Sequence, residues 1–429
     1  MKVAVVGAGV VGTTTAFELA LDGHEVTVFE RHSTVAEEAS FATGALVAAG
    51  WTAPWSTPER HIRLPWSSQN DGLKLAHLPR GSEWRWLWRW LQAGRGGYPS
   101  ARHQQIHQLV RYSQERLQSL TEEREFDHDR SQGMLVLWRT ARQAAQARTA
   151  LDHMKDLGIP HRELAAEQAR ALEPAISAET PFHGAVELMG EAVANCREFA
   201  LSIRDQARQL GCQFAFNTQV EAIEARAAPG VELRLASSGK TLEAETPLET
   251  RRFDAVVVCA GMRSAALLQP TGLRLPLRAI HSHSLSAPVR EPLDAPQSAV
   301  LDAAHGVSIA RLGQRIRVAG GRDFGMPEGQ RSAATLRQLY SVLSDWFPGA
   351  VRLGGPQGSV QEWHGAQATL PDGLPALGAS KVPGVWLNLG HGNAGWSMAC
   401  GSARLLADQL AGRSPDVGVA GCSPRRLGL

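Results

Sequence analysis

The chain has 429 residues, which at roughly 150 residues per domain predicts two or three domains and allows a sizeable core. It has 44 Lys and Arg and 42 Asp and Glu, a formal charge of +2, and this near-balance argues against nucleic acid as the main partner. The five cysteines are widely spread and form no Cys-x-x-Cys pair, so we expect no disulfide framework and no metal site. No apolar run reaches the roughly 20 residues that cross a bilayer, and we expect a cytoplasmic protein with no transmembrane segment.

The first 30 residues predict a β-α-β unit. Apolar residues at 3–6 indicate a strand, and positions 13–22 carry apolar residues at helical spacing up to Gly23. A second strand is expected at 24–30, followed by a polar, small-residue loop over 31–50. This order is typical of a doubly wound α/β fold.

The middle of the chain predicts long helices and then many short strands. Helical patterns cover 84–93, 101–124, 141–156, 163–172 and 197–210, with strands at 134–138 and 184–189. Further strands are expected at 214–216, 220–223, 231–235 and 253–259. Short strands at 281–287, 298–301, 306–312 and 315–320, separated by turn residues, indicate an antiparallel sheet, and a helix at 332–346 follows it.

The end of the chain predicts a strand at 385–389, a glycine-rich turn and a helix at 394–410, with 412–429 as a frayed tail. Nucleotide-binding pieces thus lie at the start, in the middle and at the end. We therefore expect an α/β fold in which a Rossmann-like cofactor domain (1–82, 190–276 and 360–429) accompanies a discontinuous α+β substrate domain. That second domain would comprise 83–189 and 277–359 and contain the antiparallel sheet.

The strongest motif is Gly7-Ala8-Gly9-Val10-Val11-Gly12, between the first strand and its helix. Glycine at 7 permits a tight turn, glycine at 9 admits a pyrophosphate, and glycine at 12 allows close helix–strand packing. Glu30 ends the second strand, where its carboxylate can accept hydrogen bonds from both ribose hydroxyls. The motif therefore predicts FAD or NAD rather than NADP.

A second strand–turn–helix at Gly390-His391-Gly392-Asn393-Ala394-Gly395 favours FAD over NAD. FAD is long, and a second helix N-terminus could stabilise negative charge at the pyrimidine ring of its flavin. No nucleophile elbow, phosphate loop or metal-ligand spacing competes with this reading. His103 and His107 share a helix face, but with no acidic or Cys partner they indicate a solvated face.

The chain resembles the FAD-dependent D-amino acid dehydrogenases, within the wider D-amino acid oxidase, glycine oxidase and sarcosine oxidase group. The resemblance rests on VAVVGAGVVG, on HEVTVFER, on Thr369 to Gly373 and above all on LNLGHGNAGWSMACGSARLLADQL. It implies FAD as cofactor. The residues expected at FAD are Gly7, Gly9, Val10, Val11, Gly12, Glu30, Arg31, Ser40, Thr43, Gly44, Ala45, Leu46, Val220, Ala260, Gly261, Gly390, His391, Gly392, Asn393, Ala394 and Gly395.

The substrate half departs from the family pattern. Gln367 stands where these dehydrogenases carry an arginine that would bind the substrate carboxylate through two hydrogen bonds. Arg311, Arg317 or Arg322, on strands that would roof the flavin, or Arg278 with His281 and His283, could replace that charge. Alternatively, the substrate lacks a free α-carboxylate. The residues expected at the substrate pocket are Gln367, Arg278, His281, His283, Arg311, Trp55 and Trp396.

The resemblance implies oxidation of the C–N bond of a D-amino acid to an imine, by hydride transfer to flavin N5, with electrons passing to a quinone or respiratory acceptor. Hydride transfer needs positioning more than side-chain chemistry, so we assign no catalytic residue. Two alternatives remain. The chain could oxidise a secondary amine or an N-substituted amino acid, or it could be a flavin-binding partner subunit with little activity.

Twelve tryptophans accompany only three tyrosines. Trp84, Trp86, Trp88 and Trp90 alternate with other residues in a predicted helix, and a spacing of two spreads them around the helix axis. Some must therefore reach a surface. Trp beside Arg suits a peripheral contact on the inner face of a membrane. We prefer the alternative that these tryptophans pack between the two domains.

Overall fold

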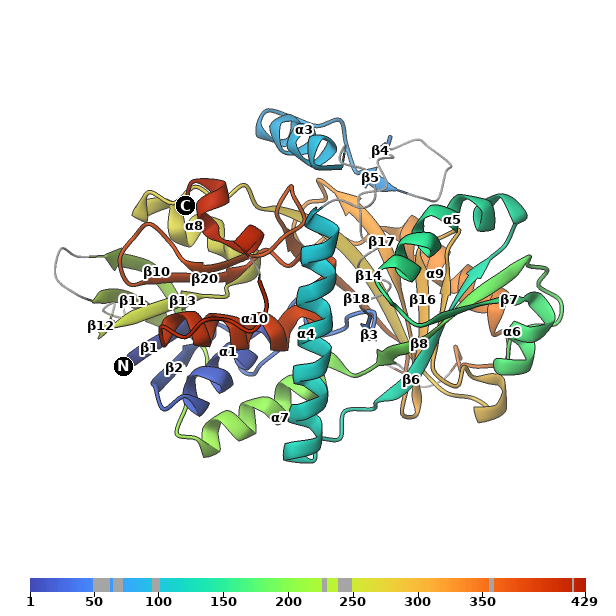
Figure 1. Cartoon of the computed structure of the whole chain (residues 1–429), viewed down its shortest axis with the longest axis horizontal. Coiled ribbons are helices and arrows are strands. Elements are labelled where there is room, and N and C mark those ends of the chain that lie inside the picture. The colour runs from blue at the N-terminus through green and yellow to red at the C-terminus, as the bar shows by residue number, and fades with distance from the viewer. Residues whose placement is uncertain are drawn as a thin grey trace.

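The computed structural model describes residues 1–48, 62–64, 72–94, 101–225, 230–237, 249–354, 359–418 and 420–429 (Figure 1). Its α-helices are α1 (Val10–Leu21), α3 (Ser82–Gly94), α4 (Ala101–Arg124), α5 (Ala141–Asp156), α6 (Ala166–Leu172), α7 (Cys196–Gln209), α8 (Ser264–Leu268), α9 (Ala333–Trp346) and α10 (Gly395–Leu410). Short 3-10 helices lie at Gly261–Arg263, Gln269–Thr271, Pro292–Asp294, Gly392–Ala394, Ala420–Cys422 and Pro424–Leu427.

The N-terminal β-α-β unit builds a six-stranded sheet in the order β19-β20-β13-β1-β2-β9. Its strands are β1 (Lys2–Val6), β2 (Glu25–Phe29), β9 (Gln213–Ala215), β13 (Ala255–Val258), β19 (Ala376–Ala379) and β20 (Val385–Leu389). All neighbours are parallel except β19 and β20. The continuous apolar runs follow from this arrangement, because a parallel sheet is covered on both faces.

Helices α1, α4, α7 and α10 lie together on one face of this sheet, with α4 standing upright beside the large sheet (Figure 1). The other face packs against a three-stranded antiparallel sheet. That small sheet consists of β10 (Thr218–Ala225), β11 (Val231–Ser237) and β12 (Glu249–Phe253). The expected doubly wound fold is confirmed, since chain segments from the start, middle and end share one core.

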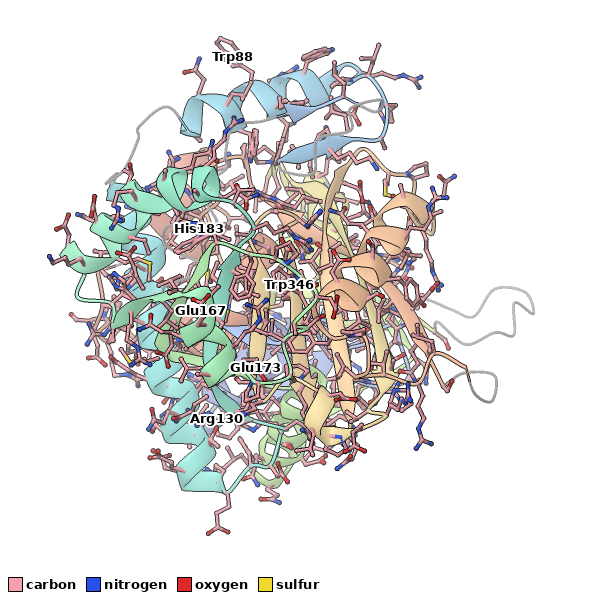
Figure 2. The ribbon with its side chains drawn as sticks, turned by 90° about the vertical axis from the view of Figure 1, so that its right-hand side faces the viewer. Trp88, Arg130, Glu167, Glu173, His183 and Trp346 are labelled. Carbon is pink, nitrogen blue, oxygen red and sulfur yellow. The ribbon has the colours of Figure 1, made fainter. Side chains whose placement is uncertain are left out.

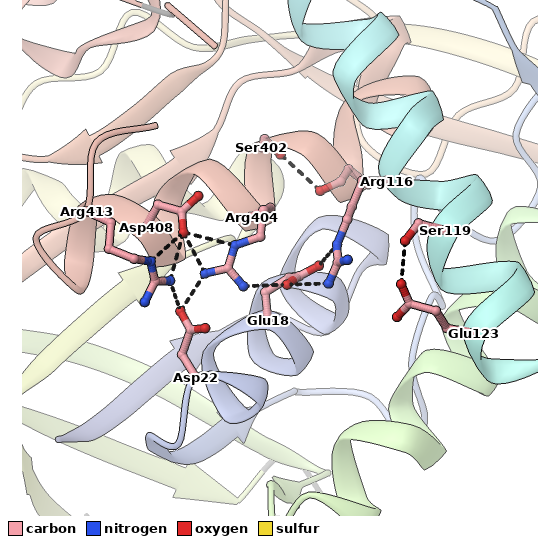
Figure 3. A network of polar contacts seen from close by, with 10 residues as sticks. Glu18, Asp22, Arg116, Ser119, Glu123, Ser402, Arg404, Asp408 and Arg413 are labelled. Carbon is pink, nitrogen blue, oxygen red and sulfur yellow. Dashed lines mark hydrogen bonds and ion pairs between the residues drawn. The ribbon is translucent and has the colours of Figure 1, made fainter. Parts of the chain in front are cut away.

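A buried carboxylate joins three of these helices. Glu18 on α1 accepts hydrogen bonds from Arg116 of α4 (Nε to Oε1, 2.7 Å) and from Arg404 of α10 (Nη1 to Oε2, 2.8 Å). Arg404 also forms ion pairs with Asp22 and Asp408, and Arg413 forms ion pairs with the same two carboxylates (Figure 3). The Glu18 side chain is inaccessible to solvent, so its charge is compensated entirely by these two arginines.

The second sheet is large and mainly antiparallel, in the order β18-β14-β17-β16-β15-β6-β8-β3. Its strands, with the small flanking strands, are β3 (Leu46–Val47), β4 (Ile62–Arg63), β5 (Leu73–Leu75), β6 (Ser131–Trp138), β7 (His161–Ala165), β8 (Gly184–Val193), β14 (Arg278–Pro288), β15 (Ala299–Asp302), β16 (Val307–Leu312), β17 (Arg315–Phe324) and β18 (Gln361–Thr369). Helix α9 covers one face and α5 the other. The expected antiparallel sheet is confirmed, whereas the domain boundaries remain a prediction, and β3 and β18 pair within this sheet.

Two local predictions are wrong. The segment 163–165 continues strand β7, paired with β8, and the helix begins only at Ala166. The C-terminal segment is not a frayed tail, because Arg426 binds Asp372 (Nε to Oδ2, 2.7 Å) and Leu429 is buried in the core. Both errors concern tertiary partners that lie far away in the sequence.

Helix α3 presents its tryptophans on two sides, as the spacing of two predicts. Trp86 and Trp90 are 3% exposed and pack with Phe324 and Ile280, whereas Trp84 and Trp88 are 58% and 57% exposed. Trp88 points away from the rest of the molecule at its edge (Figure 2). None of the described helices is long and apolar enough to cross a membrane.

Candidate cofactor and substrate site

The glycine turn after β1 has the close contacts that the motif predicts. Gly7 has φ +98°, and a Cβ there would lie 2.7 Å from the carbonyl oxygen of Cys259. A Cβ on Gly12 would lie 1.9 Å from the carbonyl oxygen of Gly7. No side chain fits at either position, so the N-terminus of α1 approaches the strand ends directly.

Glu30 lies at the carboxyl end of β2, beside this turn. Its carboxylate accepts hydrogen bonds from the backbone nitrogens of Ala8 (2.7 Å) and His32 (2.9 Å). These bonds fix the carboxylate at the edge where parallel strands of doubly wound folds bind nucleotides. The carboxylate therefore lies where it could accept hydrogen bonds from the ribose hydroxyls of a bound dinucleotide, which is the role expected from the sequence.

The loop over residues 40–46 is tied to both sheets. The Ser40 hydroxyl accepts a hydrogen bond from the nitrogen of Val10 (3.1 Å), and Ser284 of β14 donates to the carbonyl of Ala42 (2.9 Å). Ala45 has φ +63°, a conformation that is uncommon for residues other than glycine. The loop is thus held in one strained conformation between the glycine turn and the large sheet.

The C-terminal turn carries a buried neutral histidine. His391 Nε2 lies 3.2 Å from the Ser402 hydroxyl, and burial lowers the pKa of His391 to about 4. Gly390 has φ +83°, and a Cβ there would lie 2.7 Å from the Leu370 side chain. The turn therefore faces the site with backbone groups and no ionised side chain of its own.

A single cavity of about 1760 Å³ joins these elements. Every residue expected at FAD lines it except Gly12, which packs beneath the turn. The cavity runs from Glu30 and Val220 past the 40–46 loop to the turn at 390–395. Its volume exceeds that of an ordinary small-ligand pocket, as an extended dinucleotide with a substrate beside it requires.

Two of the expected substrate-pocket residues, Gln367 and Trp396, line the same cavity. Gln367 lies on β18 opposite Ile280, and Trp396 begins α10 with its ring 5.0 Å from that of Phe199. Trp55 lies outside the described residues.

The other four candidates do not line the cavity; they are Arg278, His281, His283 and Arg311. Arg278 donates to the Ser82 hydroxyl (2.5 Å), and Arg311 donates to the carbonyl of Gly313 (3.2 Å). His283 accepts from the nitrogen of Ser332, just before α9, and is not among the lining residues, while its neighbour Ser282 lines the cavity. Strand alternation thus places His281 and His283 on the opposite face.

Two cations do line the cavity near Gln367. Arg322, one of the arginines expected to replace the missing charge, lies on β17. Lys74 lies on β5, and its Nζ is 3.9 Å from Oδ1 of Asp323. Sequence reasoning missed Lys74, because a three-residue strand between segments without a clear pattern gives no signal. Arg317, by contrast, lies outside the lining and donates to the carbonyl of Thr43 (3.3 Å).

No group of three or more metal-ligating side chains occurs in the described part of the chain. His103 and His107 are buried rather than on a solvated face, so that expectation is wrong.

Comparison with protein families matches residues 2–409 to the family described as FAD dependent oxidoreductase. The D-amino acid dehydrogenase of Cereibacter sphaeroides is 34% identical over 426 residues, 97% of this chain and 93% of the relative. That of Bradyrhizobium diazoefficiens is 32% identical, over 98% of this chain and 97% of the relative.

Among solved structures, glycine oxidase from Geobacillus kaustophilus superposes with a TM-score of 0.73 at 20% identity, covering 98% of this chain and 97% of that one. L-proline dehydrogenase from P. horikoshii gives the same TM-score at 16% identity, covering 100% and 97%. These two establish the fold. FAD is the cofactor that this family uses, and the glycine turns, Glu30 and the extended cavity fit it. The chain therefore belongs to the family of FAD-dependent oxidoreductases that includes the D-amino acid dehydrogenases.

Proposed function

We propose that the protein oxidises the C–N bond of an amino acid, a D-amino acid in the first instance, to an imine that water hydrolyses to a 2-oxo acid and ammonia. The observation that carries this proposal is the meeting of Gln367, Arg322 and the 390–395 turn in one cavity. The relatives named D-amino acid dehydrogenase support the D configuration.

Three elements would hold FAD. Glu30 would bind the adenosine ribose, the N-terminus of α1 with the glycine turn would bind the pyrophosphate, and the 390–395 turn would face the flavin pyrimidine. FAD, when bound, supplies the acceptor for the hydride that leaves the substrate Cα.

Arg322 would bind the substrate carboxylate in place of the charge that Gln367 lacks. A guanidinium can bind both carboxylate oxygens at once, which fixes the orientation of the Cα–H bond as well as the substrate position. Gln367 can add a neutral hydrogen bond from its amide.

The same cations would prepare the substrate amine. Hydride loss requires a neutral amine, and the positive charges of Arg322 and Lys74 disfavour an ammonium group beside them. His391 is neutral near pH 7, because its pKa is lowered to about 4. The chain therefore needs no dedicated base, and its residues orient the substrate and exclude water.

Gln367 also supports a second candidate reaction, oxidation of a secondary amine or N-substituted amino acid.

Anaerobic reduction of the bound flavin tests both candidates. The purified holoenzyme is mixed without oxygen with D-amino acids, their L-enantiomers and N-alkyl amino acids, and bleaching is followed in the visible spectrum. We expect D-amino acids to bleach the flavin fastest. Bleaching by N-alkyl substrates alone would support the second candidate, and no bleaching by any amine would favour a partner subunit with little activity.

We further propose that electrons pass to a membrane quinone and that α3 contacts the bilayer. Trp84 and Trp88 are largely exposed beside Arg85 and Arg89, which are also exposed, a combination that suits an interface with anionic lipid. Sedimentation with vesicles of anionic and of neutral phospholipid tests the contact. The Trp84→Ser/Trp88→Ser variant should lose sedimentation, and equal sedimentation of the variant and the parent would contradict the proposal.

A further inference from the structure

The cavity continues beyond the flavin and substrate positions to the ends of β15 and β16. This extension is lined by residues of α5, of the turn between the two strands and of α9. We call it the distal arm and define it by six residues, which are Arg142, Gln146, His305, Arg337, Gln338 and Ser341.

The distal arm offers hydrogen-bond donors and positive charge. Arg142 and Arg337 carry full charges, and none of the six residues is acidic. The side-chain nitrogen of Gln338 has no acceptor among the described residues. An arm of this composition favours a ligand group that accepts hydrogen bonds and carries negative charge.

The charge of Asp323, which follows Arg322 on β17, is partly compensated within the protein. Asp323 lines the cavity, but its carboxylate is nearly inaccessible and accepts a hydrogen bond from Thr335 (2.9 Å). His283 Nδ1 lies 3.6 Å from it and Lys74 Nζ 3.9 Å. The hydrogen bond from Thr335 and the nearby charge of Lys74 therefore offset part of its negative charge.

The buried carboxylate of Asp302 connects the three segments that form the distal arm. Asp302 at the end of β15 accepts hydrogen bonds from the His305 nitrogen (3.1 Å), from Arg139 Nε (2.7 Å) and from Trp346 Nε1 (2.8 Å). Arg139 precedes α5, and Trp346 ends α9 in the interior of the molecule (Figure 2). One residue thus joins all three segments that form the arm.

The charge on Asp302 is secure at neutral pH. Burial alone would raise its pKa, but the hydrogen bond and charge of His305 and the charge of Arg139 outweigh burial and lower it. The arm thus combines backbone segments held together by Asp302 with the exposed side chains of Arg142 and Arg337, and it shares one cavity with Gln367 and Arg322.

We propose that the distal arm binds a second anionic group of the substrate, so that the preferred substrate is an amino acid or secondary amine with a carboxylate remote from the reacting carbon. This inference rests on the proposed function and adds the substrate class. A zwitterionic amino acid with a short apolar side chain would leave both arginines of the arm unused.

Matched substrates test the proposal. Anaerobic flavin reduction is measured for acidic D-amino acids of increasing chain length and for neutral analogues of similar length, such as D-2-aminoadipate beside D-norleucine. N-carboxyalkyl glycines beside N-alkyl glycines extend the comparison to secondary amines. We expect the acidic member of at least one pair to reduce the flavin roughly tenfold faster at limiting substrate.

Arg142→Gln and Arg337→Gln should each lower that acidic-to-neutral ratio roughly threefold. Arg148→Gln is the matched control, because Arg148 lies on α5, binds Glu163 (2.8 Å) and is outside the cavity lining. Faster reduction by neutral substrates in every pair, or an equal ratio in all three variants, would overturn the proposal.

Binding without turnover separates this inference from the proposed function. Glutarate and valerate, a dicarboxylate and a monocarboxylate of equal carbon number, are titrated into the holoenzyme while the flavin spectrum is recorded. Weaker glutarate binding in Arg142→Gln and Arg337→Gln, but not in Arg148→Gln, would support the arm even if no amine reduced the flavin. Equal affinities for both acids in all variants would exclude it.

Discussion

The Nε2 atom of His283 accepts a hydrogen bond of 2.8 Å from the backbone nitrogen of Ser332, the N-cap residue that precedes helix α9. The side chain of His283 is inaccessible to solvent, and His364, His281, Arg331 and Lys74 add positive charge around it. Burial first, and these charges second, lower the pKa of His283 to about 4. Protonation of Nε2 would place a second proton against the Ser332 N–H and would break this hydrogen bond.

Acidification should therefore destabilise the protein through His283. Between pH 4 and the ordinary histidine pKa near 6.5, the unfolded chain binds the proton and the folded chain does not, so stability falls as the pH falls through this window. One such proton contributes a slope of at most about 1.4 kcal/mol per pH unit. His283→Gln, whose side-chain oxygen can accept from Ser332, should remove part of the slope of urea-unfolding free energy against pH. An unchanged slope in the variant would assign the acid sensitivity to other buried histidines such as His391.

Arg322 should determine affinity for substrates that have an α-carboxylate. Replacing it with Gln removes a charged two-pronged hydrogen bond, and we expect kcat/KM to fall on the order of 10- to 100-fold for amino acids. Arg322→Lys should retain part of the affinity. Arg311→Gln is the control, because Arg311 lies on β16 and outside the cavity lining. The same loss for amines that lack a carboxylate would assign Arg322 a structural role instead.

Gly12→Ala should abolish FAD binding. The new methyl group would lie 1.9 Å from the carbonyl oxygen of Gly7, a contact that only a backbone shift of the glycine turn can relieve. The FAD content of the purified variant, measured from its visible absorbance, should be close to zero. Gly190→Ala, at a β8 position with no atom within 4 Å of the added Cβ, should retain the flavin. A yellow Gly12→Ala protein with normal FAD content would contradict the geometry of the turn.

Glu18→Gln should cost up to about 3–5 kcal/mol of unfolding free energy, because the partly buried Arg116 would lose the counter-charge of Glu18, while Arg404 would keep Asp22 and Asp408. Arg111→Ala on α4, the helix of Arg116, is the comparison. Arg111 and Glu115 are 65% and 63% exposed, and breaking such a surface pair costs roughly 0.5 kcal/mol or less. Both variants can be compared by urea unfolding at neutral pH. Similar losses in the two would mean that the α1–α4–α10 network adds little to stability.

The parts of the site that depend on local sequence were predictable. Gly7, Gly12 and Glu30 lie within one β-α-β unit, where strand, turn and helix follow from short-range pattern and backbone sterics. The turn at Gly390 is equally local. Each of these segments carries its own sequence signal, and the residues expected at FAD come from them.

The substrate side was less predictable, because it depends on which face of a strand a residue occupies. His281 and His283 lie one residue to either side of Ser282, yet only Ser282 lines the cavity. Lys74 reaches the site through a short strand that pairs with β17 from a distant part of the chain. Register between strands far apart in sequence is set by tertiary packing, which composition and periodicity do not encode.

The division of the α3 tryptophans gives one helix two kinds of fluorophore. Trp84 and Trp88 should emit at longer wavelength and be quenched by a water-soluble agent, whereas Trp86 and Trp90, stacked with a centroid distance of 6.4 Å in an apolar cluster, should not. Difference spectra between the parent and single Trp→Phe variants would then report separately on the outer side of α3 and on its attachment to β14 and β17. The unusual tryptophan content thus supplies an optical means of observing this helix without adding a label.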